Sequence, residues 1–201
     1  MGNEMMNHIH DEKPIYDESA LNDSDTTPWF GVQLYGLRPK EMADYLTGKD
    51  IESFFPMHDV DFIDREGKHR HELRPVVSNL IFIKKTMEDK LLQGMMEERY
   101  KGHFYIIRKT RGSSVFYQIP ARQMQEFMIM CNPELLMKKY LSENEAKLKK
   151  GDRVMVTHGP LKGLSGRLVR SSGKYYLLKE IPGMAVMMKV TRWCCQKMDL
   201  P

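Results

Sequence analysis

Short apolar runs separated by glycine-rich turns fill residues 149–201 and restrict how this part of the chain can fold. The segments between the runs are HGPLKG, SSG and IPG, and their Gly and Pro content is typical of turns. The runs cover residues 153–156, 166–169, 175–178 and 185–190. Short strands at this spacing predict a small β-barrel, because closure removes the exposed edges of an open sheet.

Residues 29–134 alternate between extended runs and helical stripes instead. Helices are predicted to begin at Pro39, after Thr86 and at Pro120, and the methionine-rich stripe of the last helix has the spacing of a core face. The extended runs are 29–35, 51–63, 76–83 and 104–108, and the turn at 64–68 makes a hairpin of the middle two. The order β-α-β-β-α-β predicts a split βαβ layer with helices on one face of an antiparallel sheet.

The expected fold class is therefore α+β, with an N-terminal extension, two ordered domains and a linker between them. Residues 1–28 are acidic and without hydrophobic period, which predicts a flexible extension. Residues 29–134 form the split βαβ domain, and residues 149–201 form the barrel. Residues 135–148 are charged and are predicted to be a linker.

The net charge of +4 is unevenly distributed. Residues 1–28 hold seven acids against one lysine, whereas residues 149–201 hold eleven bases against three acids. A positive field concentrated in the C-terminal domain is suited to a nucleic-acid partner. Basic residues on outward positions of a small barrel also serve solubility alone, so both interpretations stay open.

Several classes of protein are excluded by the sequence. No apolar run approaches the length of about 20 residues that crosses a bilayer, and the N-terminal residues lack the pattern of a secretory signal. Three cysteines without a CxxC pair fit a reducing compartment, so we expect a cytoplasmic protein without membrane partners. His69 and His71 lack partners at zinc-ligand spacing, and the sequence has neither a P-loop nor a dinucleotide fingerprint. We expect no enzymatic activity, no cofactor and no metal.

Two strings carry a resemblance to a known family. The first, GDRVMVTHGPLKGLSGRLV at residues 151–169, resembles the KOW motif, whose turn here consists of Gly159, Pro160, Gly163 and Gly166. These glycines permit positive φ and close backbone approach, while the proline fixes its own φ. The second, WFGVQLYG at residues 29–36, is similar to the first strand of a NusG N-terminal domain. The chain is identified as a member of the NusG family over residues 29–201.

One departure from the family pattern points to a specialised paralogue. Residues 77–83 are VSNLIFI where housekeeping members generally have FPGYVFV. Together with the acidic extension, this brings the chain closest to the UpxY-type antiterminators of capsular polysaccharide operons. The resemblance implies a transcription elongation and antitermination factor that reduces pausing or termination in a target operon. The genes of that operon would direct the synthesis of capsular polysaccharide or exopolysaccharide.

The resemblance also implies partners and site residues for the N-terminal domain. This domain would dock on the clamp helices of bacterial RNA polymerase through an apolar surface, left open where helices cover the opposite face. That surface would draw on Tyr35, Val77, Leu80, Phe82 and Phe104. Arg38 and Lys40 would approach the non-template DNA strand.

The C-terminal domain would recruit ribosomal protein S-ten or the termination factor Rho, or contact nascent RNA. For RNA, the candidate residues are basic side chains near the turns with aromatic neighbours: Lys162, Arg167, Arg170, Lys174, Tyr175 and Tyr176. The alternative function is a KOW-containing ribosome-associated or general RNA-binding protein, which would not need the split βαβ domain.

Overall fold

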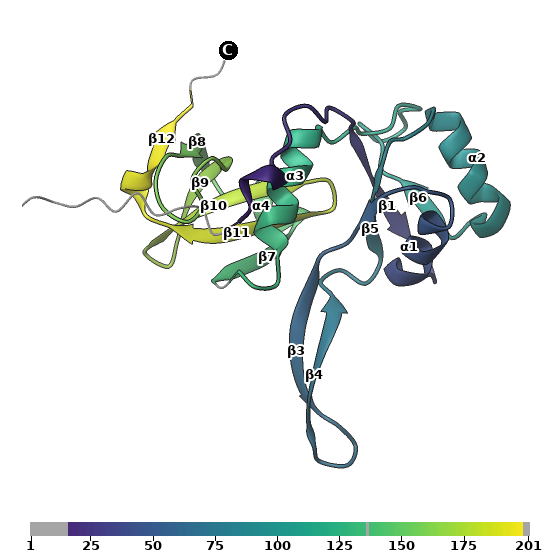
Figure 1. Cartoon of the computed structure of the whole chain (residues 1–201), viewed down its shortest axis with the longest axis horizontal. Coiled ribbons are helices and arrows are strands. Elements are labelled where there is room, and N and C mark those ends of the chain that lie inside the picture. Colours follow the sequence, from purple (N-terminus) through teal and green to yellow (C-terminus); the bar gives the residue numbers. More distant parts are fainter. Residues whose placement is uncertain (1–15, 136, 199–201) are drawn as a thin grey trace, which may run out of the picture.

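Three antiparallel sheets organise the chain (Figure 1). The computed structural model describes residues 16–135 and 137–198. Four strands form the N-terminal sheet, six form the C-terminal sheet, and two form a separate hairpin. The α+β class predicted from the sequence is confirmed.

The N-terminal sheet has the strand order β2-β5-β1-β6. Its central strand β1 pairs antiparallel with β5 on one side and with β6 on the other. The four strands are β1 (Trp29–Leu34), β2 (Ser53–Phe54), β5 (Leu80–Lys84) and β6 (Phe104–Ile106). Every second side chain of a strand points to the same face, so two sets of apolar residues lie on opposite faces of this sheet.

Helices cover both faces of the N-terminal sheet. Helices α1 (Pro39–Thr47) and α2 (Asp89–Tyr100) pack on the face that carries Phe30 and Ile81, which we call the α1–α2 face. Helix α3 (Ala121–Cys131) packs on the face that carries Leu80 and Phe82, which we call the α3 face. The prediction that the helices share one face was therefore wrong. The methionine stripe lies in the core as predicted, with Met124 and Phe127 of α3 fully buried.

A two-stranded hairpin extends away from both larger sheets (Figure 1). It consists of β3 (Met57–Ile63) and β4 (His69–Pro75), which pair from Met57↔Pro75 to Ile63↔His69. The sequence prediction paired the extended run 51–63 with residues 76–83 instead. Strand β4 is polar and exposed along its length, so it lacks the hydrophobic alternation that marks a strand packed on a core.

The C-terminal sheet has the order β12-β8-β9-β10-β11-β7. The predicted barrel is not closed, because β12 and β7 form the two edges of the sheet in the described part of the chain. The short helix α4 (Glu143–Lys147) and the 3-10 turn η2 (Arg192–Cys194) complete this region. Its strands are β7 (Lys138–Ser142), β8 (Gly151–Val156), β9 (Ser165–Ser171), β10 (Lys174–Ile181), β11 (Met184–Val190) and β12 (Cys195–Lys197).

Residues 138–142, within the segment 135–148 that was predicted as a linker, form a strand of the C-terminal sheet. Strand β7 pairs with β11 from Met184↔Ser142 to Met188↔Lys138. Ser142 then caps α4, and Glu145 reaches back to the Ser142 backbone, so that both halves of a capping box form. An edge strand with only one face on the core carries few apolar residues, and this explains why the segment has the composition of a linker.

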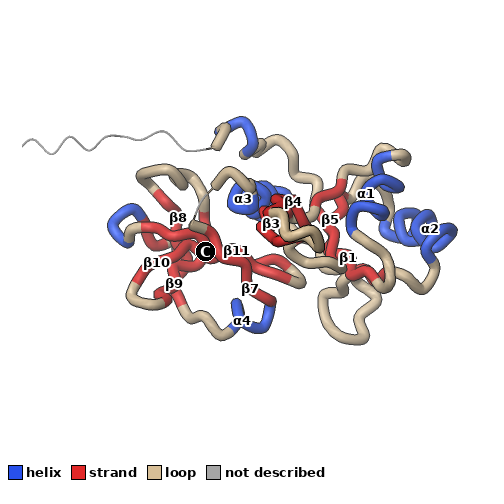
Figure 2. The backbone as a smooth tube through the Cα atoms, turned by 90° about the horizontal axis from the view of Figure 1, so that it is seen from below, coloured by secondary structure: helices blue, strands red, loops and turns tan. Residues whose placement is uncertain are grey.

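Helix α3 lies between the two sheets and joins them (Figure 2). One continuous apolar core includes Phe82 of the N-terminal sheet, Phe127 of α3, and Leu177 and Val186 of the C-terminal sheet. The two halves of the chain are therefore packed against each other rather than separated. In the described residues, no helix is long and apolar enough to cross a membrane.

Part of the predicted flexible extension is also packed on this core. Residues 18–20 form the 3-10 turn η1 (Glu18–Ala20), and Leu21 contacts the core that α3 shares with both sheets. Residues 1–15 of the extension lie outside the described part of the chain.

Candidate functional site

Two of the five residues predicted to bind polymerase are buried on the α3 face. Leu80 is 1% exposed and Phe82 is fully buried, with the Phe82 ring centre 5.8 Å from that of Phe127. Val77 is partly buried against the same core. The apolar surface predicted from the sequence thus exists, but its centre is covered.

The other two aromatic residues of the predicted set do not join that centre. Phe104 pairs with Leu34 and packs on the α1–α2 face, opposite to Leu80, so its predicted place beside Leu80 was wrong. Its neighbour Tyr105 lies on the α3 side of β6 and is 40% exposed. Tyr35, just after β1, is 52% exposed, and its backbone N–H donates to the His103 carbonyl at 2.7 Å. The open rim of the α3 face therefore carries Tyr105, with Tyr35 at the end of β1.

A turn of the C-terminal sheet covers Leu80. This turn joins β10 to β11 and consists of Pro182 and Gly183. Gly183 has φ +91, and a Cβ there would lie only 2.9 Å from Leu80 Cδ2. At Gly31 of β1, a Cβ would lie 3.0 Å from Ile107 Cδ1 and 3.6 Å from the Pro182 carbonyl oxygen. Only glycine satisfies both the backbone conformation and the space at position 183.

A buried ion pair holds α3 against the C-terminal sheet. Glu126 of α3 and Lys179 of β10 have side chains that are 3% and 8% exposed, and they contact each other directly. Ser165 Oγ donates to Glu126 Oε2 at 2.9 Å, and Arg122 Nε lies 3.3 Å from Glu126 Oε1. Burial lowers the pKa of Lys179, while the Glu126 carboxylate acts in the opposite direction. Because these charges have left water, each is stable there only with the other in place.

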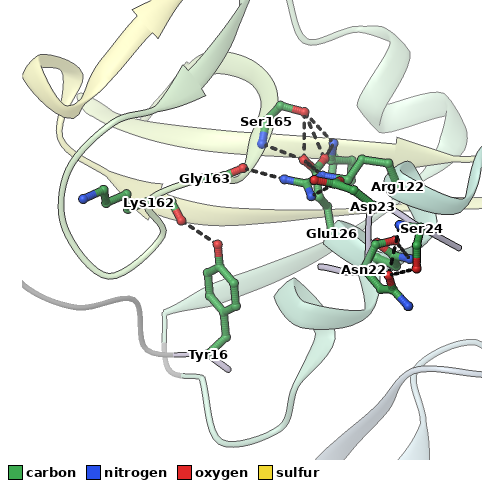
Figure 3. Close-up of polar contacts among 11 residues, drawn as sticks. Tyr16, Asn22, Asp23, Ser24, Arg122, Glu126, Lys162, Gly163 and Ser165 are labelled. Carbon is green, nitrogen blue, oxygen red and sulfur yellow. Dashed lines mark hydrogen bonds and ion pairs between the residues drawn. The ribbon is translucent and has the colours of Figure 1, made fainter. Parts of the chain in front are cut away.

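Residues 16–25 run along the same junction (Figure 3). Tyr16 Oη donates to the Lys162 carbonyl at 2.5 Å, and Asp23 pairs with Arg122 of α3 at 2.9 Å. Gln125 Nε2 donates to the Asn22 carbonyl at 3.0 Å. This segment therefore links a turn of the C-terminal sheet to α3.

The basic residues predicted to bind nucleic acid fall into different environments. Arg38 and Lys40 are exposed at the start of α1. Arg167 is engaged within the fold, since it donates to the Lys149 and Ala146 carbonyls and pairs with Glu180 at 2.5 Å. Its predicted role as a free phosphate contact is thus not supported by its surroundings.

Arg170 and Lys174 remain exposed at the end of the C-terminal sheet. Tyr175, which follows Lys174 and pairs with Arg170, is partly exposed, whereas Tyr176 is only 5% exposed and packs in a small core with Ala146. Of the two tyrosines that were predicted to lie on the surface, only Tyr175 does so. Lys162 lies in the turn contacted by Tyr16.

The glycines of the predicted KOW turn have the backbone roles expected of them. Gly159 and Gly163 adopt φ +83 and +90, values that L side chains rarely take. A Cβ at Gly166 would lie 2.6 Å from the Leu178 carbonyl oxygen, so this glycine allows β9 and β10 to approach closely. Pro160 lies in the same turn, just before Leu161, which is buried.

The sequence analysis missed two exposed residues beside Arg170 and Lys174. Arg192 and Trp193 follow β11, and Trp193 is 68% exposed. Together with Tyr175 they line an open hollow of about 600 Å³. The sequence signal that could have indicated them is an arginine followed directly by a tryptophan near the end of a basic domain.

Fold and surface together define a class of protein: an α+β binding module with an apolar face beside a basic β domain. A family model described as "Transcription termination factor nusG" matches residues 27–128, slightly more than half of the chain. No curated protein matches the chain. The chain belongs to the NusG family, a family of non-enzymatic transcription factors that bind RNA polymerase.

Proposed function

We propose that this chain is a specialised NusG-like elongation and antitermination factor. It docks on the clamp helices of RNA polymerase through the α3 face and reduces pausing or termination in a target operon. The target operon carries genes for capsular polysaccharide or exopolysaccharide. The match to the NusG family over residues 27–128 is the observation that carries the proposal.

The α3 face supports docking at its rim. Tyr35 and Tyr105 are large, exposed aromatic side chains near an otherwise apolar face. Aromatic side chains contribute strongly to protein interfaces, because they bury a large area at low cost in conformational entropy. These two tyrosines are the first contacts available to a polymerase helix.

Docking at the centre of the face requires a rearrangement. Leu80 becomes accessible only when the Pro182–Gly183 turn moves away, because that turn lies against it. The Glu126–Lys179 pair and the shared core oppose this movement. Polymerase binding through Leu80, Val77 and Phe82 therefore competes with the packing between the two sheets.

The finer parts of the proposal concern the paralogue type and the further partners. The string VSNLIFI at residues 77–83 and the acidic extension support a UpxY-type antiterminator. The glycine turn at 159–166 supports a KOW domain, which would recruit ribosomal protein S-ten or Rho. Arg38 and Lys40, exposed at the start of α1, would meet the non-template DNA strand in the cytoplasm.

Affinity purification of the full chain from a bacterial host tests the function. RNA polymerase should co-purify, and run-on transcription profiling with and without the protein should show longer transcripts of one operon. Enrichment of ribosomes without polymerase would instead support the alternative of a ribosome-associated RNA-binding protein. Profiles that change equally across all operons would contradict the specialised role.

A further inference from the structure

The open hollow at the end of the C-terminal sheet has features of a binding site. It has a volume of about 600 Å³ and is lined by Lys174, Tyr175, Lys189, Val190, Thr191, Arg192 and Trp193. We call it the Trp193 hollow. Strand β10 runs from Lys174 at the hollow to Ile181 beside the turn on Leu80, a length of about 25 Å. The hollow therefore lies at the end of the sheet away from the α3 face, near the short yellow helix in Figure 1.

Two aromatic rings are presented at this hollow. Trp193 is 68% exposed, and the His158 ring lies 6.1 Å from it. Tyr175 lies on β10, directly across from Val190 of β11. An indole that stays largely in water loses the stabilisation it would gain by burial, so such a ring on a small domain indicates a ligand surface.

The position of Trp193 is fixed by the backbone around it. The Cys194 N–H donates to the Thr191 carbonyl at 3.2 Å, which closes the η2 turn. The Thr157 N–H then donates to the Cys194 carbonyl at 2.8 Å and ties this turn to the end of β8. The backbone that carries the ring is thus held in place before any ligand arrives, which reduces the entropy lost on binding.

Four cations lie at or beside the hollow, two of them at the Tyr175 ring. The guanidinium groups of Arg170 and Arg192 each lie 5.9 Å from the centre of the Tyr175 ring. Lys174 and Lys189 add two more charges, and the described residues that line the hollow include no acid. This arrangement places positive charge next to an aromatic surface.

These four cations differ from three others of the same sheet. Arg167, Lys179 and Lys197 each pair with a carboxylate within 4 Å. Among the interactions of residues 16–135 and 137–198, no such pair involves Arg170, Lys174, Lys189 or Arg192. The positive charge at the hollow is therefore not neutralised by these parts of the chain and attracts an anionic ligand.

We propose that the Trp193 hollow binds single-stranded nucleic acid. Bases stack on Trp193 and Tyr175, while the four cations contact the phosphates. Exposed aromatic rings inside a basic groove are the combination that single-strand binding requires, because an unpaired base offers its flat face and its phosphate together. A duplex keeps its bases stacked on each other and offers these rings only its backbone.

The ligand has two possible sources in a transcribing complex, an RNA transcript or a displaced DNA strand. The inference deepens the proposed function, since it gives the C-terminal sheet a ligand that remains accessible while this sheet covers the α3 face. Its test uses the full chain and oligonucleotides without polymerase, so it can fail while polymerase docking holds, and the reverse.

Tryptophan fluorescence tests the proposal directly. The chain has two tryptophans, and Trp29 is 3% exposed whereas Trp193 is 68% exposed. Titration of the full chain with a single-stranded 12-residue RNA, or with DNA of the same sequence, should quench the fluorescence of Trp193. Trp193→Phe should abolish the quenching, yet still bind by fluorescence anisotropy of a labelled strand, because phenylalanine also stacks.

Variants separate stacking from charge. Trp193→Ala and Tyr175→Ala should each weaken binding by about tenfold or more. Arg192→Gln and Lys174→Gln should each reduce the slope of log affinity against log salt by about 0.7. Two controls, Leu91→Ala and Lys197→Gln, remove an exposed apolar side chain and a paired cation elsewhere and should leave affinity unchanged. Circular dichroism of each variant checks that the fold is kept.

Three outcomes would overturn the inference. The first is that neither strand quenches the fluorescence at strand concentrations up to about 0.1 mM, which is the weak end of non-specific dissociation constants. The hollow would then serve another partner, such as a protein. The second is equal affinity for duplex and single strand. The third is unchanged affinity of folded Trp193→Ala. Preference for RNA over DNA would identify the transcript as the source, and preference for DNA would identify the displaced strand.

Discussion

The two faces of the N-terminal sheet are covered in different ways. On the α1–α2 face, Phe30, Val32 and Ile81 pack against helices of the same domain, and the contacts are apolar throughout the core. On the α3 face, Leu80 and Phe82 pack against α3 and against a turn of the other sheet. There the cover includes the Glu126–Lys179 pair and two glycine positions with close contacts.

We therefore expect the cover of the α1–α2 face to persist while the domain is folded, and the cover of the α3 face to depend on a few side chains as well. Apolar helix-to-sheet packing is lost only when the domain unfolds, because its stabilisation comes from area removed from water. A cover held partly by charges and by a single turn depends on a few specific residues. The cover of the α3 face adds the ion pair and the glycine turn to an apolar core, so we expect it to be the more sensitive of the two to single substitutions. Four experiments test this in order of expected effect.

Breaking the buried ion pair should have the largest effect. Glu126→Ala leaves Lys179 charged and without its partner inside the junction, which should lower the free energy of unfolding by about 3–5 kcal/mol. Urea denaturation measures the loss. Glu126→Leu combined with Lys179→Met removes both charges and should recover most of it. A loss below about 1 kcal/mol for Glu126→Ala would mean that the pair does not hold the sheets together.

The turn on Leu80 offers a matched pair of glycines. Gly183→Ala must strain a backbone with φ +91 and also displace Leu80, whereas Gly173→Ala, with φ +75, meets nothing within 4 Å. Both should cost about 1–2 kcal/mol for the backbone, and Gly183→Ala should cost about 1–3 kcal/mol more for overpacking. The difference between their unfolding free energies measures the contact across the junction. Equal costs would show that the turn does not press on Leu80 in solution.

The N-terminal segment should contribute less. Asp23→Asn removes an ion pair to Arg122 in which the Asp23 side chain is 87% exposed. Exposed pairs contribute about 0–1 kcal/mol, so the loss should lie in that range and should shrink at high salt. Chemical denaturation at two salt concentrations provides the check. A loss that is larger and independent of salt would assign a structural role to this segment.

The smallest effect concerns pH. A hydrogen bond from Lys84 lowers the pKa of Asp25 from 3.8 to about 2. Because the folded-state pKa is depressed, the contribution of this contact is complete above pH 4 and is lost as pH falls towards 2. NMR titration of Asp25 in the Lys84→Met variant should return its pKa towards 3.8. An unchanged low value would show that the backbone N–H of Thr27 accounts for the shift.

Much of the fold follows from local patterns in the sequence. Pro39, Pro120 and the Met124–Cys131 stripe mark helices because proline and spacing act within one helix. The glycine turn at 159–166 was recognisable for the same reason, since positive φ is a local requirement. Such signals need no knowledge of what packs against the element.

The candidate site was harder to predict because it depends on which side of each element is covered. Strand β6 carries apolar or aromatic residues at successive positions, so the sequence offers no contrast to place Phe104 and Tyr105 on their faces. Leu80–Ile83 is apolar at every position, which is the pattern of a strand buried on both faces. Arg167 differs from Arg170 through Glu180 and through the Lys149 and Ala146 carbonyls, partners that only the folded chain brings close.

Binding to RNA polymerase tests the central claim, that the α3 face and not the α1–α2 face meets the enzyme. Tyr105→Asp changes the exposed rim of the α3 face, and Leu91→Asp changes an exposed apolar residue of α2 as a matched control; their exposures are 40% and 62%. The full chain and both variants are titrated against purified core polymerase. The account predicts that Tyr105→Asp weakens binding about tenfold or more, because the variant loses an aromatic contact and places a charge beside an apolar face, while Leu91→Asp binds normally. Normal binding by Tyr105→Asp with loss in Leu91→Asp would contradict it.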